Sequence, residues 1–239
     1  MRALRTISDN LPALIVSLPV TFFVLFVSVA IALLLGLLLA LQKMSRNPAA
    51  RIISSVYISF MRGTPMVVQI LIVFISVPLL LNNFGISTDG WNNMIYAIFA
   101  FSLNEAAFFA EIFRSAYTAI DKGQIEAAQS VGMSKSQVFL HVILPQGSAF
   151  ALPNTTNMII ELMKNTSLGL AIGVVDLMGQ AKQISLNNYG VGQTEVFVAA
   201  AVMYWIITAI LLTVSHSITK WLNRCENATV QLKEKRVAA

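Results

Sequence analysis

The stretch DKGQIEAAQSVGMSKSQVFLHVILP, at residues 121–145, is a polar and partly basic segment set between long apolar segments. It contains the triplet EAA at 126–128, a glycine at Gly132 and the closing triplet ILP at 143–145. An ordinary interfacial loop with its polar side chains in water is one interpretation. The spacing of helix caps and apolar positions favours another, a folded helical loop held between membrane spans.

Two short helices are predicted within this stretch. Asp121 and Ser134 are suitable N-caps, and each is followed three residues later by a glutamine, as in a capping box. Gly132 can adopt the left-handed conformation that ends a first helix. Pro145 is expected to stop the second helix, because proline lacks the N–H that continues the hydrogen-bond ladder. The expected result is a compact pair of helices that meet at a glycine.

The composition is typical of a membrane protein. Apolar residues make up 56% of the 239 residues and charged residues 11%, against about 25% charged in soluble domains. The net charge of +5 does not indicate nucleic-acid binding, because the basic residues lie at the ends of apolar segments rather than among aromatic ones. The single cysteine, Cys225, excludes an internal disulfide, and its place in a basic tail indicates a reducing compartment.

Five apolar segments are long enough to cross a bilayer, since each crossing needs roughly 20 residues. Helices are expected because lipid-exposed backbone must be hydrogen-bonded within its own segment and strand-like alternation is lacking. The first segment is too long for the apolar region of a cleaved signal peptide. The predicted fold is an all-α integral membrane protein with a single transmembrane domain over residues 1–239. The predicted spans are 11–41, 54–81, 91–120, 148–175 and 196–221, with a helical cytoplasmic loop at 121–146 and a basic tail at 222–239.

The distribution of lysine and arginine predicts the orientation of these spans. Ten of these residues lie in the 43–51 connection, the central loop and the C-terminal tail, and three lie in the regions that alternate with them. Because positively charged loops stay in the cytoplasm, the central loop and the C-terminus are predicted inside and the N-terminus outside. Arg2 and Arg5 act against this orientation for the first span.

Four further motifs occur in order along the chain: FMRGTP at 60–65, SLNEAAFFAEIFR at 102–114, ALP at 151–153 and KNTSL at 164–168. Together with the central loop they resemble the permease subunits of ATP-binding-cassette importers. The resemblance is to the polar amino acid branch, which includes histidine, glutamine and cystine permeases, and it covers nearly the whole chain.

In this family the central loop is the coupling loop, which receives motion from a separate ATPase subunit. The residues that the resemblance assigns to coupling are Glu126, Ala127, Ala128, Gly132, Val138, Phe139 and Pro145. Val142 stands where the loop pattern has isoleucine, a neutral change at an aliphatic position. Asn165 stands where this branch often has an acidic residue after the lysine.

The resemblance also implies partners. The chain carries no glycine-rich lysine motif for phosphate, so ATP and Mg are expected to bind a separate subunit, and this chain is predicted to be no enzyme. No catalytic residue, cofactor or metal site is predicted within it. The expected partners are two ATP-binding subunits, a second copy or a sister permease, an extracellular solute-binding protein and the bilayer of a prokaryotic cell membrane. An amino acid would then cross by alternating access.

Several charged residues fall inside predicted spans, where an unpaired charge costs at least about 2.5–3.5 kcal/mol. Glu111 and Arg114 lie three residues apart on one predicted helix, and they are expected to form a structural pair. Glu161 and Lys164 have the same spacing near the middle of the fourth span, where a purely structural pair is harder to justify.

A zwitterionic amino acid needs donors for its carboxylate and acceptors for its ammonium group. The lysine, the two hydroxyls and Asn104 of the candidate set suit the carboxylate, and either glutamate suits the ammonium. Asn165 offers a donor and an acceptor without charge, which favours a neutral side chain such as that of glutamine or cystine. Hydrogen bonding between helices is an equally good interpretation of the neutral residues. The candidate substrate residues are Asn104, Glu105, Glu161, Lys164, Asn165, Thr166 and Ser167.

The sequence Arg62-Gly63-Thr64-Pro65 predicts a broken or kinked second span, because Pro65 leaves the carbonyl of Met61 without its helical donor. Irregular backbone at membrane depth is tolerated where it is packed in protein or lines a cavity. A hinge and a lining of the substrate pathway are both consistent with these four residues.

Two other functions were weighed against the permease. A stand-alone ion-coupled amino acid carrier usually has internal repeats and more spans in one chain. A channel or a membrane-bound enzyme needs a filter-like loop, a metal cluster or a nucleophile paired with a base, and His141 and His216 are isolated. Neither alternative accounts for the central loop.

Overall fold

The computed structural model describes the backbone of residues 2–237 and the side chains of 5–218 and 220, and helices joined by short connections make up this part of the chain. The prediction of an all-α protein is confirmed, and residues 2–237 contain no strand. The side chains of the predicted basic tail at 222–239 lie outside the described residues. The helices are α1 (Arg2–Lys43), α2 (Pro48–Gly63), α3 (Met66–Asn83), α4 (Asn93–Thr118), α5 (Lys122–Ser130), α6 (Lys135–Val138), α7 (Leu144–Asn165), α8 (Leu177–Asn187) and α9 (Gln193–Val237), with a π-helical segment η1 (Phe139–Ile143) and a 3-10 segment η2 (Thr166–Ile172).

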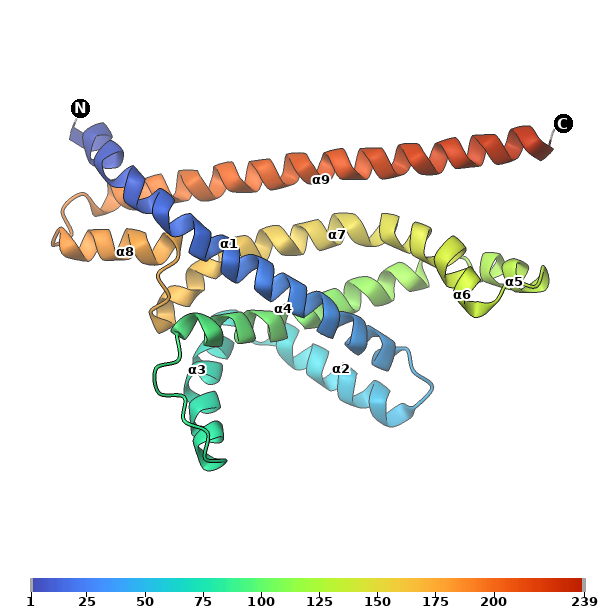
Figure 1. Ribbon diagram of the computed structural model, residues 1–239, viewed down its shortest axis with the longest axis horizontal. Coiled ribbons are helices and arrows are strands. Elements are labelled where there is room, and N and C mark those ends of the chain that lie inside the picture. Colours follow the sequence, from blue (N-terminus) through green and yellow to red (C-terminus); the bar gives the residue numbers. More distant parts are fainter. Residues whose placement is uncertain (1, 238–239) are drawn as a thin grey trace.

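Four long helices, α1, α4, α7 and α9, form the body of the molecule and extend along its length (Figure 1). The connection between α1 and α2, the pair α5 and α6, and the C-terminal end of α9 lie toward one end. The N-terminal part of α1 and α8 lie toward the other end. The three segments that the lysine and arginine pattern groups together are therefore at the same end of the molecule.

Small residues let α1 lie close against α4. A Cβ atom built at Gly36 would lie 2.7 Å from Cβ of Phe109 and 3.0 Å from the carbonyl oxygen of Ala106. Ser28 and Ser102 are both fully buried, and the Ser102 Oγ lies 3.4 Å from the Ser28 carbonyl oxygen. Membrane helices pack through such small residues because they allow the backbones to approach.

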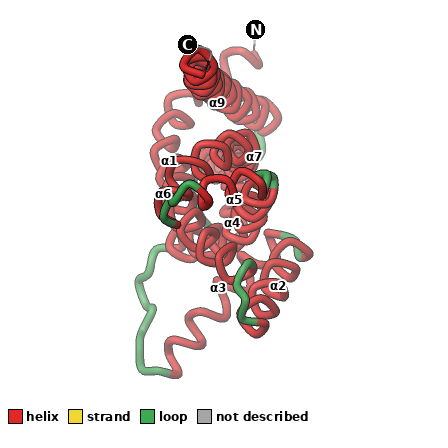
Figure 2. Tube along the Cα trace, turned by 90° about the vertical axis from the view of Figure 1, so that its right-hand side faces the viewer, coloured by secondary structure: helices red, strands yellow, loops and turns green. Residues whose placement is uncertain are grey.

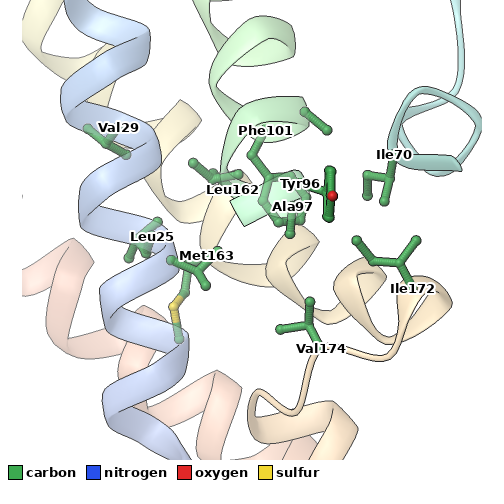
Figure 3. Close-up of a cluster of buried hydrophobic side chains, with 12 residues drawn as sticks. Leu25, Val29, Ile70, Tyr96, Ala97, Phe101, Leu162, Met163, Ile172 and Val174 are labelled. Atoms are coloured by element: carbon green, nitrogen blue, oxygen red, sulfur yellow. The ribbon is translucent and has the colours of Figure 1, made fainter. Parts of the chain in front are cut away.

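The main core lies where α1, α3, α4, α7 and η2 meet (Figure 3). Side chains from distant parts of the sequence point toward one another there, with Leu25 and Val29 from α1 on one side and Ile70 from α3 on the other. Between them lie Tyr96, Ala97, Phe101, Leu162, Met163, Ile172 and Val174. This core holds the middle of α4 against the end of α7, where the candidate substrate residues are found.

The number of candidate membrane spans agrees with the prediction if one bent helix pair is counted as a span. Four helices are long and apolar enough to cross a bilayer: Arg5–Lys43, Met66–Asn83, Asn93–Thr118 and Gln193–Ile218. The fifth candidate is the pair Lys135–Ile172 and Leu177–Asn187, which bends by 44°.

The second predicted span, 54–81, is not one helix. The chain forms α2 and α3 with a break at Thr64, whose backbone is extended, and at Pro65. The residue before a proline avoids the helical conformation, and proline cannot donate to the preceding turn. After this break α3 runs away from the other helices (Figures 1 and 2). Only α3 of this pair is long enough to be a candidate span.

The fourth predicted span, 148–175, also differs from the structure. The α-helix ends at Asn165, the 3-10 segment η2 follows, and Gly173 takes a left-handed conformation with φ of 80°. The connection predicted after this span then contains the helix α8, which begins after Asp176. The polar residues of this segment led to the prediction of a loop, but α8 is an amphipathic helix that packs against α1 and α9.

Candidate functional site

The two short helices predicted in the central loop are present as α5 and α6. Asp121 caps α5 by accepting a hydrogen bond from the Gly123 N–H at 2.8 Å. Ser134 and Gln137 form the predicted capping box at the start of α6. Gly132 has φ of +86°, the left-handed conformation predicted for the junction. One detail differs, since the Gln124 Oε1 accepts from the Gln146 Nε2 at 2.7 Å, which ties α5 to α7.

The prediction that Pro145 stops the second helix is wrong. The chain passes from α6 through η1 into α7 without a break, and the Leu144 N–H bonds to the Phe139 carbonyl across a π turn. Proline is tolerated in the first turn of α7, where a backbone N–H is not required. The hydrogen bonds change from the α to the π pattern just before Pro145, so its missing N–H does not break the helix. One helical column therefore runs from Lys135 to Asn165 (Figure 1).

The predicted coupling residues divide into a buried and an exposed group. Ala128 and Val138 are buried, and they hold α5 against the column. Glu126, Ala127, Gly132 and Pro145 are exposed. Large apolar side chains are exposed in the same region, at Val131, Phe139, Leu140 and Leu144. This end of the molecule thus presents both polar and apolar side chains on rigid helices.

Glu111 on α4 forms an ion-pair cluster near that end. Its Oε1 accepts from the Arg114 Nε at 2.8 Å and from Nη2 at 2.5 Å, so the predicted structural pair is confirmed. Its Oε2 accepts from Lys43 Nζ at 2.8 Å. Lys43 is the last residue of α1, so the cluster fastens the end of α1 to α4.

Glu105, six residues earlier on α4, has a very different environment. Its side chain is 2% exposed, and its Oε2 has no hydrogen-bond partner within the described part of the chain. Glu161 on α7 is close enough to act on it electrostatically. Glu161 and Lys164 are exposed on this chain, and no ion pair joins them despite their spacing. The fold therefore leaves one buried and two exposed charged side chains free for another group.

The break between α2 and α3 is held by two amide side chains. The Met61 carbonyl, freed by Pro65, accepts from Gln69 Nε2 at 2.9 Å and from Asn104 Nδ2 at 3.1 Å. Gln69 Nε2 also donates to the carbonyl and the hydroxyl oxygen of Thr64, at 3.2 and 2.6 Å. Asn104 Nδ2 donates in addition to Gln69 Oε1 at 2.9 Å. The segment predicted as a hinge or pathway lining and one predicted substrate residue thus belong to one network.

A second network closes the break between η2 and α8. Asp176 is fully buried, and its Oδ1 accepts from the Gly179 N–H at 2.9 Å. Its Oδ2 accepts from the hydroxyls of Tyr204 and Thr166, at 3.1 and 3.3 Å. Thr166 is 1% exposed, and its one hydroxyl hydrogen lies within reach of both Asp176 Oδ2 and the Met163 carbonyl oxygen, which is 2.9 Å from the hydroxyl oxygen. Thr166 could contact substrate or form hydrogen bonds between segments, and these contacts favour the second interpretation.

The remaining predicted residues lie near these networks. Asn165 is half-buried at the end of α7, and the Ser167 hydroxyl donates to the Lys164 carbonyl at 2.7 Å. Arg62 is exposed, with its guanidinium carbon 5.3 Å from the centre of the Phe108 ring. Within residues described with side chains, no group of three or more histidine, cysteine, aspartate or glutamate residues could hold a metal ion.

Sequence reasoning missed Gln69, Lys43, Asp176 and Tyr204. Gln69 is a lone amide in an apolar segment four residues after a proline, which is a signal that a broken turn needs a donor. Asp176 precedes an amphipathic stretch as an N-cap does, and this signal was available too. Lys43 and Tyr204 carry no local signal, because their partners are far away in sequence.

Comparison with known proteins gives a consistent family. Residues 32–225 match the family described as "Binding-protein-dependent transport system inner membrane component". The L-cystine transport system permease protein TcyL of Bacillus subtilis (strain 168) is 39% identical over 208 residues, 87% of this chain and 86% of that protein. The putative glutamine transport system permease protein GlnP of Rickettsia bellii (strain RML369-C) is 33% identical over 196 residues, 82% of this chain and 86% of that protein.

Solved structures support the same fold. The structure titled "Crystal structure of an amino acid ABC transporter with histidines" matches with a TM-score of 0.78 and 31% identity, covering 89% of this chain and 95% of that one. An inward-facing MetNI methionine ABC transporter matches with a TM-score of 0.71, 20% identity, and coverage of 90% and 98%. The second likeness concerns the fold alone.

Proposed function

This chain belongs to the family of binding-protein-dependent transport system inner membrane components, and we propose that it carries a polar amino acid with a neutral side chain across the membrane. It is a membrane-embedded permease subunit of an ATP-driven ABC importer, as its relatives are. It is no enzyme, because ATP hydrolysis in such systems belongs to a separate subunit. A stand-alone carrier is not favoured.

The observation that carries the proposal is the helical column from Lys135 to Asn165. Its first end, with α5, presents Phe139 and Leu140 to a partner. Its far end holds Lys164 and Asn165, which follow Glu161 within about one turn, and Glu161 acts electrostatically on Glu105 of α4. A displacement at the first end is thus carried along a rigid element to the candidate substrate residues. This connection is what a coupling loop requires.

A Gly132→Ile substitution tests the coupling role. We expect the permease to insert and to assemble with its second copy, while substrate-stimulated ATP hydrolysis falls at least fivefold, because a β-branched residue resists the left-handed conformation. The matched control is Gly85→Ile, which imposes the same strain at φ of +76° in the connection after α3. Both glycines have open space around them. Equal loss of hydrolysis in the two variants would contradict a coupling role for α5 and α6.

The proposed orientation has α5 and α6 in the cytoplasm and the N-terminus outside. It rests on the lysine and arginine pattern and on the position of α5, α6 and the α1–α2 connection at the same end of the molecule. In a Cys225→Ser background, a cysteine replacing exposed Asn83 should react with an impermeant thiol reagent in intact cells. One replacing exposed Ser136 should react only after permeabilisation. The opposite pattern would reverse the orientation.

The proposed partners are two ATPase subunits that bind ATP and Mg, a second copy of this chain or a sister permease, and an extracellular solute-binding protein. The relatives and solved structures are components of ABC transporters, which supports these classes of partner. Proteoliposomes with all components should take up L-cystine or L-glutamine only with internal ATP. Uptake by this chain alone, without ATP, would support the ion-coupled carrier instead.

The preference for a neutral side chain rests on Asn165 and on the cystine and glutamine systems among the relatives. An aspartate at this depth attracts a cationic side chain, since charge attraction is strong where water is scarce. In proteoliposomes with excess binding protein, Asn165→Asp should raise ATPase stimulation by L-arginine at least threefold relative to L-glutamine. An unchanged ratio would remove Asn165 from the site.

A further inference from the structure

We propose that Gln69 is a positioning residue that fixes the amide of Asn104 so that only its carbonyl oxygen is available to the substrate. Asn104 then recognises the ammonium group of an amino acid and not its carboxylate. This inference rests on the proposed function and adds a rule of recognition to it. It also reassigns Asn104, which the sequence placed with the groups for the carboxylate.

The orientation of the Gln69 amide follows from its neighbours. Gln69 is 5% exposed, and its nitrogen faces the carbonyl oxygens of Met61 and Thr64, at 2.9 and 3.2 Å. A backbone carbonyl can only accept a hydrogen bond. The Thr64 hydroxyl donates to the Phe60 carbonyl at 2.9 Å, so it too acts as an acceptor toward Gln69. A turned Gln69 amide would place oxygen against oxygen three times, and the observed orientation is therefore the stable one.

The orientation of Asn104 follows from that of Gln69. Its nitrogen donates to Gln69 Oε1 at 2.9 Å and to the Met61 carbonyl at 3.1 Å, which uses both of its hydrogens. Its Oδ1 accepts no hydrogen bond from a described residue. That oxygen is not sealed from the surface, since within the described part of the chain Glu105 Oε2 is the one fully buried side-chain polar atom without a partner. Asn104 thus offers an acceptor and no donor.

The surrounding charges point to the same ligand chemistry. Glu105 follows Asn104 directly on α4, and its Oε2 lacks a partner. Glu161 adds a second carboxylate that acts on Glu105. An ammonium group carries positive charge and three donors, which match these acceptors, and exposed Lys164, three residues beyond Glu161, is left for the carboxylate of the same ligand. The break at Pro65 is in this way coupled to the choice of substrate group, because it supplies the carbonyls that orient both amides.

The test is binding to the purified permease–ATPase complex without the solute-binding protein, so that the permease alone discriminates. The probes are L-cystine, L-glutamine and 4-carbamoylbutanoate, which is glutamine without its amino group. We expect the wild-type complex to bind glutamine at least tenfold more tightly than the analogue. In Gln69→Leu this ratio should fall at least threefold, because only the longer bond to the Met61 carbonyl then holds the Asn104 amide in this orientation.

The control is Gln183→Leu on the exposed face of α8, which should leave both affinities unchanged. Loss of structure alone would weaken both ligands equally, so an unchanged ratio in Gln69→Leu would overturn the inference. If that variant does not assemble, Asn104→Ala removes the acceptor itself and should lower the ratio at least threefold; an unchanged ratio would overturn the inference. A wild-type complex that binds neither L-glutamine nor L-cystine would instead overturn the proposed function.

Discussion

Glu105 and Glu111 lie about 9 Å apart along the same helix, at 1.5 Å per residue, and their surroundings are opposite. Glu111 is partly exposed and contacts two cations, Lys43 and Arg114. Glu105 is buried, and one of its oxygens has no partner. A charge that the chain neutralises itself needs no ligand to explain it. A buried carboxyl group whose oxygen the chain leaves unsatisfied is expected to meet a ligand or a moving element, and this difference distinguishes the structural glutamate of α4 from the one expected to act in transport.

Disrupting the contact between α1 and α4, which lies between Glu105 and Glu111 along α4, should have the largest effect on stability. Gly36→Ala places a methyl group 2.7 Å from Cβ of Phe109, in a contact that only a backbone shift relieves. We expect the free energy of unfolding of the assembled complex to fall by about 2–3 kcal/mol. Thermal unfolding in detergent, followed by fluorescence size exclusion, measures this loss.

Gly147→Ala is the matched control, because its new Cβ would lie 3.8 Å from the nearest side-chain atom, an ordinary contact. It should be neutral or stabilising by up to about 1 kcal/mol through helix propensity. Equal melting temperatures for the two variants would show that the α1–α4 contact is not tight. The close packing of α1 on α4 would then not be what determines the positions of Glu105 and Glu111.

Removing the paired charge should have the next largest effect. Glu111→Gln leaves Lys43 and Arg114 without their anion, and we expect a loss of about 1–2 kcal/mol, between the values for exposed and buried pairs. Transport per folded complex should not change. A double-mutant cycle with Lys43→Met isolates the direct interaction, and a coupling energy of zero would make this cluster incidental.

Replacing the unpartnered carboxyl group should change stability least. Glu105→Gln eliminates a buried carboxylate with an orphaned oxygen, so the free energy of unfolding should stay within about 1 kcal/mol or rise. Substrate-stimulated ATP hydrolysis per folded complex should fall on the order of tenfold, the typical cost of losing about 1.4 kcal/mol of binding. A destabilised complex with normal hydrolysis would show that Glu105 is structural, like Glu111.

Features set by neighbours in sequence were predictable. The caps at Asp121 and Ser134, the left-handed Gly132 and the freed carbonyl of Met61 each follow from the hydrogen-bonding needs of one turn. The pair of Glu111 and Arg114 is local for the same reason. Spacing alone does not guarantee a contact, since Glu161 and Lys164 have the same spacing as Glu111 and Arg114 and form no ion pair.

Features set by packing were not predictable. Lys43 reaches Glu111 across 68 residues only because Gly36 brings α1 against α4. The error at Pro145 has a similar origin, since the rule for proline in an α-helix does not foresee a π turn beside it. The partition of the substrate candidates into buried Thr166 and exposed Lys164 also depends on which helices surround α7.

The π turn at Phe139–Ile143 has a mechanical consequence. A π turn holds one more residue than an α turn, and it is one of two irregular points in the column, the other being Pro153 inside α7. Compression along the axis passes through it, since the backbone atoms remain stacked. Torque is transmitted less well, since a wider turn can unwind without breaking the helices on either side. The column should therefore transmit a shift along its axis better than a rotation about it. Tilting of α6 in a partner's cleft would then move α7 along its length and leave the orientation of Lys164 and Asn165 unchanged.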